Sequence, residues 1–529
     1  GFPRTVPYSR PRPPPLQSTS PHWLLIDMIY IKYTPSLCVI LIHLLRIGLL
    51  SLARAQLSNS LSESCHQRGC IMWKVIVATT LLLFTSSMAL ASVKEAPKEM
   101  SEETKECVKC HQKTNPGIIQ QWGRSKHFGA NVGCYECHAA NKGDVDAYIH
   151  DDKKVKKLIA IIVSPKDCAN CHEKAAHEMT TSRHAKAGHI IDSLDNLLAE
   201  VVEGNRAFVT EGFPEGNSSA AVNGCWQCHG SKVKVLEDGA LDPATWPNTG
   251  IGRINPDGSE GTCSACHSRH QFSTEQARKP DNCGKCHLGP DHPQKEIYEE
   301  SKHGIAFKAY EDQLNMDSAK WVVGVDYTAA PTCATCHMGA TRTQDSTHNV
   351  GERISWTNRP PISVRPEVMD KKMGLESANL KWEDRRENMQ DVCEACHTEV
   401  YVENFYIQYD SLIELYNEKY AKPGKELVAA AKPLLKEAKF SNKIDWIWFE
   451  LWHHEGRRAR MAASMMAPDY THWHGTYDLA KHWYTKFVPE LEKLIKEGKA
   501  AGGDKKKAAE ALQKTLDKVL SNDDHKWYL

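Results

Sequence analysis

Sixteen of the 19 cysteines in this 529-residue chain lie in eight C-x-x-C-H pentapeptides. This pentapeptide is the attachment sequence of c-type haem, in which two thiols bond to the porphyrin and the adjacent histidine ligates the iron. One copy also fits a redox dithiol or half a zinc site, but eight copies, each ending in histidine, leave only haem attachment. The predicted haem-binding cysteines are Cys107, Cys110, Cys134, Cys137, Cys168, Cys171, Cys225, Cys228, Cys263, Cys266, Cys283, Cys286, Cys333, Cys336, Cys393 and Cys396. The predicted proximal ligands of eight haems are His111, His138, His172, His229, His267, His287, His337 and His397.

The other histidines are candidates for the sixth iron ligand. Of the 26 histidines, three precede Met72 and eight belong to the motifs, which leaves 15. Eight bis-histidine haems would use eight of these, whereas an enzyme with one open iron would use seven. Recurring contexts such as S-K-H and S-R-H favour His127, His184, His189, His270, His303 and His348, with His150 or one of His453 and His454 as the seventh.

A second sequence feature indicates export. Residues 72–91 have a basic start, an apolar run over 75–84 and small residues ending at Ala91, which is the pattern of a secretory signal peptide. We expect the mature chain to begin near Ser92. Residues 1–71, which contain the other three cysteines, are then predicted to be upstream or disordered and absent from the mature protein. The chain has no net formal charge, which argues against a nucleic-acid partner.

The elements that position the haems can also be predicted. Motifs only 20 to 60 residues apart leave little room for sheet, so we expect residues 92–397 to form short helices and loops around the haems. Residues 398–529 contain no further motif and show helical spacing of apolar residues, which predicts a bundle of long helices that also mediates oligomerisation. The fold class is therefore a mostly α multihaem cytochrome c with very little strand.

Boundary residues refine this prediction. Pro423, Gly424 and Gly498 fit helix boundaries, and Gly502-Gly503 precedes an amphipathic C-terminal helix that we expect to be mobile. His525 is expected to be a tail residue without a role.

Four further segments carry a resemblance. With the eight motifs, "CGKCHLGPDHPQ" at 283–294, "ESKHG" at 300–304, "NRPPISVRPE" at 358–367 and "MAPDYTHWHG" at 466–475 resemble the octahaem hydroxylamine oxidoreductases and the related hydrazine dehydrogenases. The resemblance runs from about Cys107 to about Lys496. It implies an exported protein, in a periplasm or an anammoxosome lumen, without a membrane anchor.

The resemblance also implies a catalytic site. In that family one haem has an open distal position and is cross-linked to a tyrosine of a neighbouring subunit, which links a homotrimer covalently. By analogy the catalytic haem is the fourth, with His229 as proximal ligand, and Tyr470 is the cross-linking residue, with Tyr477 and Tyr484 as alternatives. The same resemblance makes Asp291 and His292, four and five residues after the sixth motif, the expected distal acid–base groups, which would take protons as general bases.

These residues lead to an expected reaction and to rivals. The leading reaction is oxidation of hydroxylamine to nitric oxide or nitrite, with electrons leaving one at a time through seven other haems to a soluble cytochrome c. Hydrazine oxidation to dinitrogen is an alternative. An octahaem nitrite reductase and a non-catalytic electron-transfer cytochrome are further alternatives, neither of which requires a tyrosine cross-link.

Overall fold

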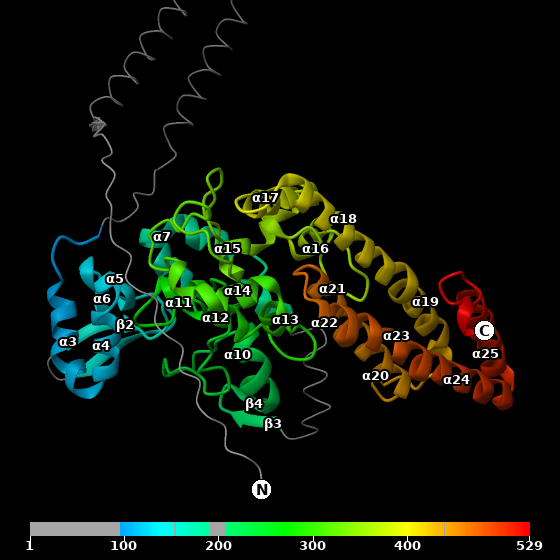
Figure 1. Cartoon of the computed structure of the whole chain (residues 1–529). Coiled ribbons are helices and arrows are strands. Elements are labelled where there is room, and N and C mark those ends of the chain that lie inside the picture. The colour runs from blue at the N-terminus through cyan, green and yellow to red at the C-terminus, as the bar shows by residue number, and fades with distance from the viewer. Residues whose placement is uncertain (1–95, 153–154, 191–206, 439) are drawn as a thin grey trace, which may run out of the picture. The chain divides into compact units, whose positions relative to one another are not determined.

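The computed structural model describes residues 96–152, 155–190, 207–438 and 440–529. The chain divides into two compact units, residues 1–91 and 92–529, and every described residue belongs to the second. The predicted signal peptide at 72–91 and the upstream segment 1–71 lie outside the described residues. Helices make up 58% of the structure and strands 7%, which confirms the predicted mostly α fold class. Figure 1 shows the element order.

Short helices carry the haem motifs and the segments between them. They are α3 (Glu102–Thr114), α4 (Pro116–Gly123), α5 (Lys126–Gly129), α6 (Cys134–His138), α7 (Pro165–Thr180), α8 (Ala187–Ile190), α10 (Trp226–His229), α11 (Thr274–Arg278), α12 (Pro280–Gly284), α13 (Gln294–Glu300), α14 (Lys302–Tyr310), α15 (Cys333–His337) and α16 (Pro366–Met373). Single turns add η1 (Ala221–Cys225), η2 (Cys263–Ala265), η3 (Glu311–Gln313), η4 (Val350–Arg353) and η5 (Glu376–Asn379).

Serine side chains start several of these helices. The hydroxyls of Ser101, Ser125 and Ser301 accept hydrogen bonds from backbone N–H groups in the first turns of α3, α5 and α14. Such an N-cap satisfies a donor that the helix itself cannot pair. Each cap therefore fixes where its helix begins, and with it the position of the residues in the first turn.

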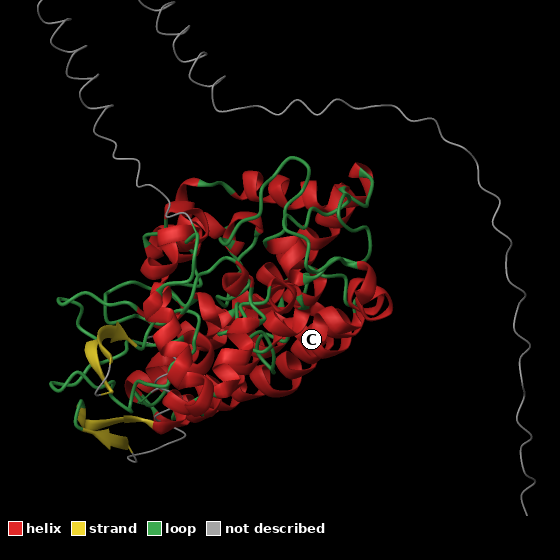
Figure 2. Cartoon of the chain, turned by 90° about the vertical axis from the view of Figure 1, so that its left-hand side faces the viewer, coloured by secondary structure: helices red, strands yellow, loops and turns green. Residues whose placement is uncertain are grey.

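Two antiparallel hairpins supply the strands of the described residues. β1 (Ala147–Asp152) pairs with β2 (Val155–Ala160), and β3 (Ala207–Thr210) pairs with β4 (Phe213–Ser218). Figure 2 shows these hairpins in yellow among the red helices. The first hairpin places His150 opposite Lys157 in the strand register.

The C-terminal part contains helices that continue through widened turns. They are α17 (Trp382–Glu394), α18 (Glu399–Tyr416), η6 (Asn417–Ala421), α19 (Lys422–Ala431), η7 (Lys432–Leu434), α20 (Lys443–Phe449), η8 (Glu450–Glu455), α21 (Gly456–Ala463), α22 (Pro468–Thr471), η9 (His472–Tyr477), α23 (Asp478–His482), η10 (Trp483–Phe487), α24 (Val488–Ala501), α25 (Gly503–Leu520) and η11 (Lys526–Tyr528). Pro423 lies in the first turn of α19, as predicted, directly after the π-helical turn η6.

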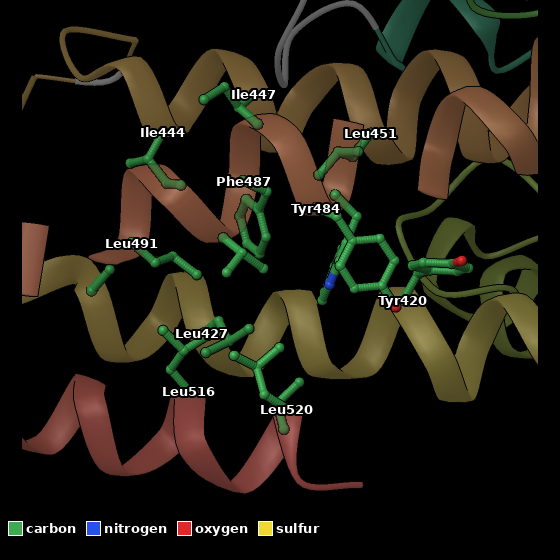
Figure 3. Packing of buried hydrophobic residues seen from close by; sticks show 14 of the residues in the cluster. Tyr420, Leu427, Ile444, Ile447, Leu451, Tyr484, Phe487, Leu491, Leu516 and Leu520 are labelled. Atoms are coloured by element: carbon green, nitrogen blue, oxygen red, sulfur yellow. The ribbon is translucent and has the colours of Figure 1, made fainter. Parts of the chain in front are cut away.

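The main apolar core lies in this bundle. Leu427, Ile444, Leu451, Phe487 and Leu516 come from five different helical segments and meet in one buried cluster, shown in Figure 3. Burial of such side chains stabilises a fold by roughly 1.5–3 kcal/mol each. The predicted C-terminal helical bundle is therefore confirmed, and its helices pack around one apolar core.

One glycine prediction needs correction. Gly498 lies inside α24 and is not at a helix boundary. A Cβ at this position would come within 2.9 Å of the Ala509 Cβ, so glycine is needed for close packing. It permits α24 and α25 to pack closely. Gly502 and Gly503 have positive φ angles of 73° and 53°, so they form the turn between these two helices.

The expected mobile tail is also packed against the bundle. Leu512, Leu516 and Leu520 of α25 belong to the main core cluster. His525 is 1% exposed, with Nδ1 2.8 Å from the Tyr484 hydroxyl and Nε2 2.8 Å from the Lys419 carbonyl. It therefore anchors the C-terminus, because both ring nitrogens have partners. Across the part of the chain that is described, no helix has the length and apolar character needed to cross a lipid bilayer.

Candidate functional site

One cavity of about 2310 Å³ brings the haem motifs together. Its lining includes all eight motif histidines and 13 of the 16 motif cysteines. Ordinary small-molecule sites occupy about 300–1,000 Å³, so this cavity exceeds the space needed for one small ligand. Its size and its lining both fit several haems held side by side.

The charge of the cavity also fits haem. Twelve lysines and arginines line it, against four aspartates and glutamates. Each c-type haem has two propionate groups, and buried carboxylates are stabilised by nearby cations. The excess of basic side chains in a chain without net charge therefore matches a set of anionic cofactors.

Six motif histidines face a second histidine across this cavity. If two imidazoles ligate one metal at about 2 Å each, their ring centroids lie about 6 Å apart. The observed centroid distances are 6.0 Å for His111/His150, 6.5 Å for His138/His270, 6.1 Å for His172/His127, 6.5 Å for His267/His348, 6.2 Å for His287/His184 and 6.1 Å for His397/His303. Each pair is spaced to hold one iron between its rings.

Local sequence explains several of these placements. In both S-K-H segments the serine caps a helix, so His127 and His303 occupy the second position of α5 and α14. In S-R-H the buried Ser182 hydroxyl accepts the backbone N–H of His184 at 3.2 Å. The recurring serine thus fixes the backbone that presents the histidine.

Two proximal rings are oriented by neutral acceptors. His138 Nδ1 lies 2.8 Å from the Ala160 carbonyl oxygen, and His111 Nδ1 lies 2.9 Å from Asn115 Oδ1. Because these oxygens only accept, Nδ1 carries the proton and Nε2 keeps its lone pair for a metal. These tautomers are the ones that haem ligation requires.

Other predicted ligands have different surroundings. His189 Nε2 lies 2.9 Å from Glu260 Oε1, and the side chain is half exposed, so no motif histidine is brought opposite it within the described residues. Within the same residues, no second histidine ring stands opposite His337 at the spacing of the six pairs. His189 as an iron ligand remains a prediction.

The fourth motif has its own local structure. The π-helical turn η1 leads directly into α10, and Gln227 Nε2 donates to the Val222 carbonyl at 2.8 Å across the widened turn. Past the motif, the backbone N–H groups of Ile251 and Gly252 donate to the Cys228 and His229 carbonyls at 2.9 and 3.0 Å.

A close backbone crossing then fixes this segment. Gly230 has a φ of 80°, and a Cβ on it would lie 2.4 Å from the Arg253 nitrogen. A Cβ on Gly250 would lie 1.9 Å from the Gly230 nitrogen, so only glycine fits at both positions. Close backbone contacts therefore help to hold the chain around His229.

Asp291 and His292 lie next to this fourth motif. The Cys228 thiol is hydrogen-bonded to the Cys286 thiol of the sixth motif, and His292 Nε2 lies 2.9 Å from the Cys286 carbonyl. His292 Nδ1 lies 2.5 Å from Asp291 Oδ1. The two predicted acid–base residues are thus brought together beside the predicted catalytic attachment site.

Their protonation follows from these contacts. His292 Nε2 faces a carbonyl and Nδ1 faces a carboxylate, so both nitrogens donate and the ring is an imidazolium. Burial lowers the pKa of His292, but Asp291 more than offsets this and the pKa is raised. Burial likewise raises the pKa of Asp291, but His292, His453 and Arg457 together lower it to about 2. In this arrangement the Asp291 carboxylate can accept a proton and the His292 imidazolium can donate one, whereas the sequence predicted two bases.

Two residues of the C-terminal bundle complete the cluster. Arg457 Nη1 lies 3.4 Å and His453 Nε2 lies 3.8 Å from Asp291 Oδ2. Arg457 Nε and Nη2 also donate to the Arg359 carbonyl at 3.1 and 2.8 Å, which fixes the guanidinium. The sequence analysis predicted His453 only as a possible haem ligand and did not predict a role for Arg457. Their four-residue spacing on one helical face was the available signal.

Tyr470 lies near this region but outside the cavity lining of its own chain. Its backbone N–H donates to Glu300 Oε1 at 3.1 Å, and Glu300 belongs to α13, the helix that follows Asp291 and His292. Tyr477 is 46% exposed, whereas Tyr484 is buried and bonded to His525. Of the three candidate tyrosines, Tyr484 is therefore enclosed within the bundle.

The motifs are also neighbours of one another. Neighbouring cysteine side chains join the first motif to the second (Cys107 and Cys134), the third to the fifth (Cys168 and Cys263), the fourth to the sixth (Cys228 and Cys286) and the sixth to the seventh (Cys283 and Cys333). The fourth attachment site therefore adjoins the sixth, and the sixth in turn adjoins the seventh.

Comparisons with known proteins agree with this picture. Residues 254–427 match a family model described as seven times multi-haem cytochrome CxxCH, and residues 62–139 match one described as cytochrome c554 and c-prime. Over 330 residues the chain is 27% identical to a probable nitrite reductase–hydroxylamine oxidoreductase fusion protein of Kuenenia stuttgartiensis. That match covers 55% of this chain and 34% of the relative, so the chain spans about a third of the relative's length.

Two solved structures are also similar. A hypothetical multiheme protein has a TM-score of 0.62 and 27% identity, covering 78% of this chain and 98% of that one. A reducing HAO-like protein complex of Kuenenia stuttgartiensis has a TM-score of 0.49 and 18% identity, covering 76% and 87%. Together with the C-x-x-C-H motifs and the cavity that joins them, the two family-model matches indicate that the chain carries c-type haems, as multihaem cytochromes do.

Proposed function

We propose that this protein is an oxidoreductase that oxidises hydroxylamine to nitric oxide or nitrite at the haem attached to Cys225 and Cys228. The observation that carries the proposal is the placement of Asp291 and His292 beside the Cys228 thiol. The similar fusion protein, which is named as a probable nitrite reductase–hydroxylamine oxidoreductase, supports the same chemistry.

The reaction needs a route for protons as well as electrons. Oxidation of hydroxylamine to nitric oxide releases three protons and three electrons, and oxidation to nitrite consumes a water and releases five protons and four electrons. When bound, a haem at this site supplies an iron that takes the substrate nitrogen and accepts electrons one at a time. The other seven proposed haems would hold those electrons until a soluble cytochrome c removes them.

The side chains of this chain would handle the protons. Asp291 is a carboxylate between three cationic or hydrogen-bearing groups, so it can accept a proton from the substrate, while His292, protonated on both ring nitrogens, can donate one. His292 keeps a proton on Nε2 toward the Cys286 carbonyl, which fixes the ring. Proton transfer by a positioned group of this kind contributes about 10²–10⁴-fold to a rate.

The oligomeric state and location belong to the same proposal. We propose a homotrimer in which Tyr470 cross-links to the fourth haem of a neighbouring subunit, in an exported protein of a periplasm or an anammoxosome lumen. Tyr470 does not line its own cavity, and Trp473 and Tyr477 beside it are 54% and 46% exposed. An exposed aromatic segment of this kind suits contact with another subunit.

Nitrite reduction is the second candidate, and one observation favours it. His292 and Arg457 present hydrogen-bond donors on both sides of Asp291, and an oxyanion such as nitrite binds to donors. Hydrazine oxidation needs the same proton acceptor as hydroxylamine oxidation. Turnover must therefore distinguish these three substrates.

The test is steady-state turnover of the haem-loaded full chain. Hydroxylamine and hydrazine are offered with oxidised cytochrome c, and nitrite is offered with a reduced dye, with the nitrogen product identified in each case. Asp291→Asn should lower kcat for hydroxylamine by about 10²-fold or more, while Asp281→Asn, an exposed carboxylate on α12, should not. A loaded protein that turns over nitrite alone would support the second candidate and contradict the first.

Mass spectrometry of denatured protein tests the cross-link. Covalent trimers that become single chains in Tyr470→Phe would support Tyr470 as the linking residue. Wild-type chains that separate on denaturation would contradict the cross-link.

A further inference from the structure

The histidine pair of the fifth motif has a carboxylate beside it. His348 faces His267 at a centroid distance of 6.5 Å. Glu178 Oε2 accepts the backbone N–H of His348 at 2.9 Å and lies 3.6 Å from its Nδ1. The carboxylate thus lies beside Nδ1 of the imidazole, which leaves Nε2 to ligate an iron.

Glu178 is held in this place. It lies on α7, the helix that carries the third motif, and its side chain is 16% exposed. Lys174, one turn earlier on α7, has its Nζ 3.8 Å from Glu178 Oε1. The other charged or titratable group that acts on His348 is His172 of the third motif.

This environment differs from that of other ligand rings. Neutral oxygens of Asn115 and Ala160 accept from Nδ1 of His111 and His138. A carboxylate near Nδ1–H withdraws that proton more strongly than a neutral oxygen does, so the imidazole becomes a more basic ligand. A more basic ligand stabilises the higher charge of the oxidised metal.

We propose that Glu178 is a positioning residue that lowers the reduction potential of the fifth haem site by acting through His348. This inference does not depend on the proposed substrate, because it concerns the haem potentials alone. The fifth haem site also adjoins the third, because the side chains of Cys168 and Cys263 are neighbours.

The test is a spectroscopic redox titration of the haem-loaded full chain without substrate. In Glu178→Gln, one of the titrating components should move to a higher potential. A tenfold change in that equilibrium would correspond to about 59 mV for one electron. Glu178→Asp, which keeps the charge, should restore much of the wild-type value, and Glu173→Gln, an exposed neighbour on α7, should leave the titration unchanged.

A second variant keeps the proposal testable where Glu178→Gln fails to retain haem. Lys174→Gln removes the cation that partly neutralises Glu178, and Lys174 is 62% exposed, so folding should survive. The same component should then move to a lower potential by a smaller amount. An unchanged titration in a fully loaded Glu178→Gln, or an unchanged or upward shift in Lys174→Gln, would overturn the proposal.

Discussion

At the scale of single residues, the side chains around Asp291 determine the ionisation of its carboxyl group. His292, His453 and Arg457 approach it from the sixth-motif turn and from the C-terminal bundle. Charged partners at this distance lower a carboxyl pKa, and this opposes the effect of burial. The result is a base that stays ionised in a partly buried site.

Arg457 is the residue on which this ionisation can be tested. Removing its charge in Arg457→Gln should let the pKa of Asp291 rise from about 2. The carboxylate form then disappears at a higher pH as acid is added, so the acid limb of kcat/KM for hydroxylamine should shift upward by roughly one pH unit. The measurement is the pH profile of initial rates from about pH 2 upward, with brief exposure to acid.

Arg457→Lys provides the control for that profile. It retains a charge near Asp291 but loses the paired donation to the Arg359 carbonyl, so its profile should lie near the wild-type one. An Arg457→Gln profile that superposes on the wild type would show that Arg457 does not act through Asp291.

At the scale of elements, capping serines link local sequence to haem ligation. Ser301 is 2% exposed, accepts the Gly304 N–H at 3.1 Å and donates to the Tyr298 carbonyl at 2.7 Å. Ser301 therefore fixes the start of α14 at Lys302, and with it the position of His303. This explains why serine precedes these histidines in the sequence.

Ser301→Ala should lower the free energy of unfolding by about 1–2 kcal/mol, through the lost cap and the lost buried hydrogen bond. It should also alter the low-spin spectrum of one haem, because His303 is displaced. Ser273→Ala is the matched control, since Ser273 caps α11 in the same way without a following ligand histidine. A spectral change of equal size in both variants would contradict a specific role for Ser301.

Helix contacts in the bundle depend on a small residue. At Gly498 a Cβ would come within 2.9 Å of both Ala509 Cβ and Leu434 Cδ2. Gly498→Val should therefore destabilise the protein by about 1–3 kcal/mol through overpacking. Gly123→Ala, where a Cβ meets nothing within 4 Å, should be nearly neutral by the same thermal unfolding measurement.

At the scale of the whole molecule, a buried ionic network joins distant segments. The fully buried Asp370 accepts from Arg183 Nε at 2.6 Å and from Arg385 Nη2 at 2.7 Å. Arg183 precedes the ligand His184, so this network connects the cavity wall to α16 and α17. Burial raises the pKa of Asp370, but the two arginines more than offset this and lower it.

The network predicts an acid-sensitive stability. Because the pKa of Asp370 is lower in the folded state than its unfolded value of about 4, its stabilisation is complete above about pH 4 and is lost as pH falls further. Asp370→Asn should cost about 3–5 kcal/mol near neutral pH, because it leaves two buried arginines uncompensated. Thermal unfolding between pH 3 and pH 7 checks this, and a wild-type loss below pH 4 that Asp370→Asn fully retains would contradict the assignment.

Much of the architecture could be predicted from periodicity and motif spacing. The short helices around C-x-x-C-H and the helical C-terminal part follow from local patterns, which need no knowledge of distant contacts. Gly498 and His525 were mispredicted, because each is decided by a neighbouring helix that the local sequence does not reveal.

The sequence by itself determined the chemistry of attachment, since thiol and imidazole spacing within five residues fixes what can bond to one haem. It also named six histidines that the structure places opposite motif histidines. Only the tertiary structure decided which ring faces which, that Asp291 meets Arg457 and His453, and that Glu178 stands beside His348. The physical reason is that these contacts join residues 39 to 170 positions apart, so they exist only once the chain has folded.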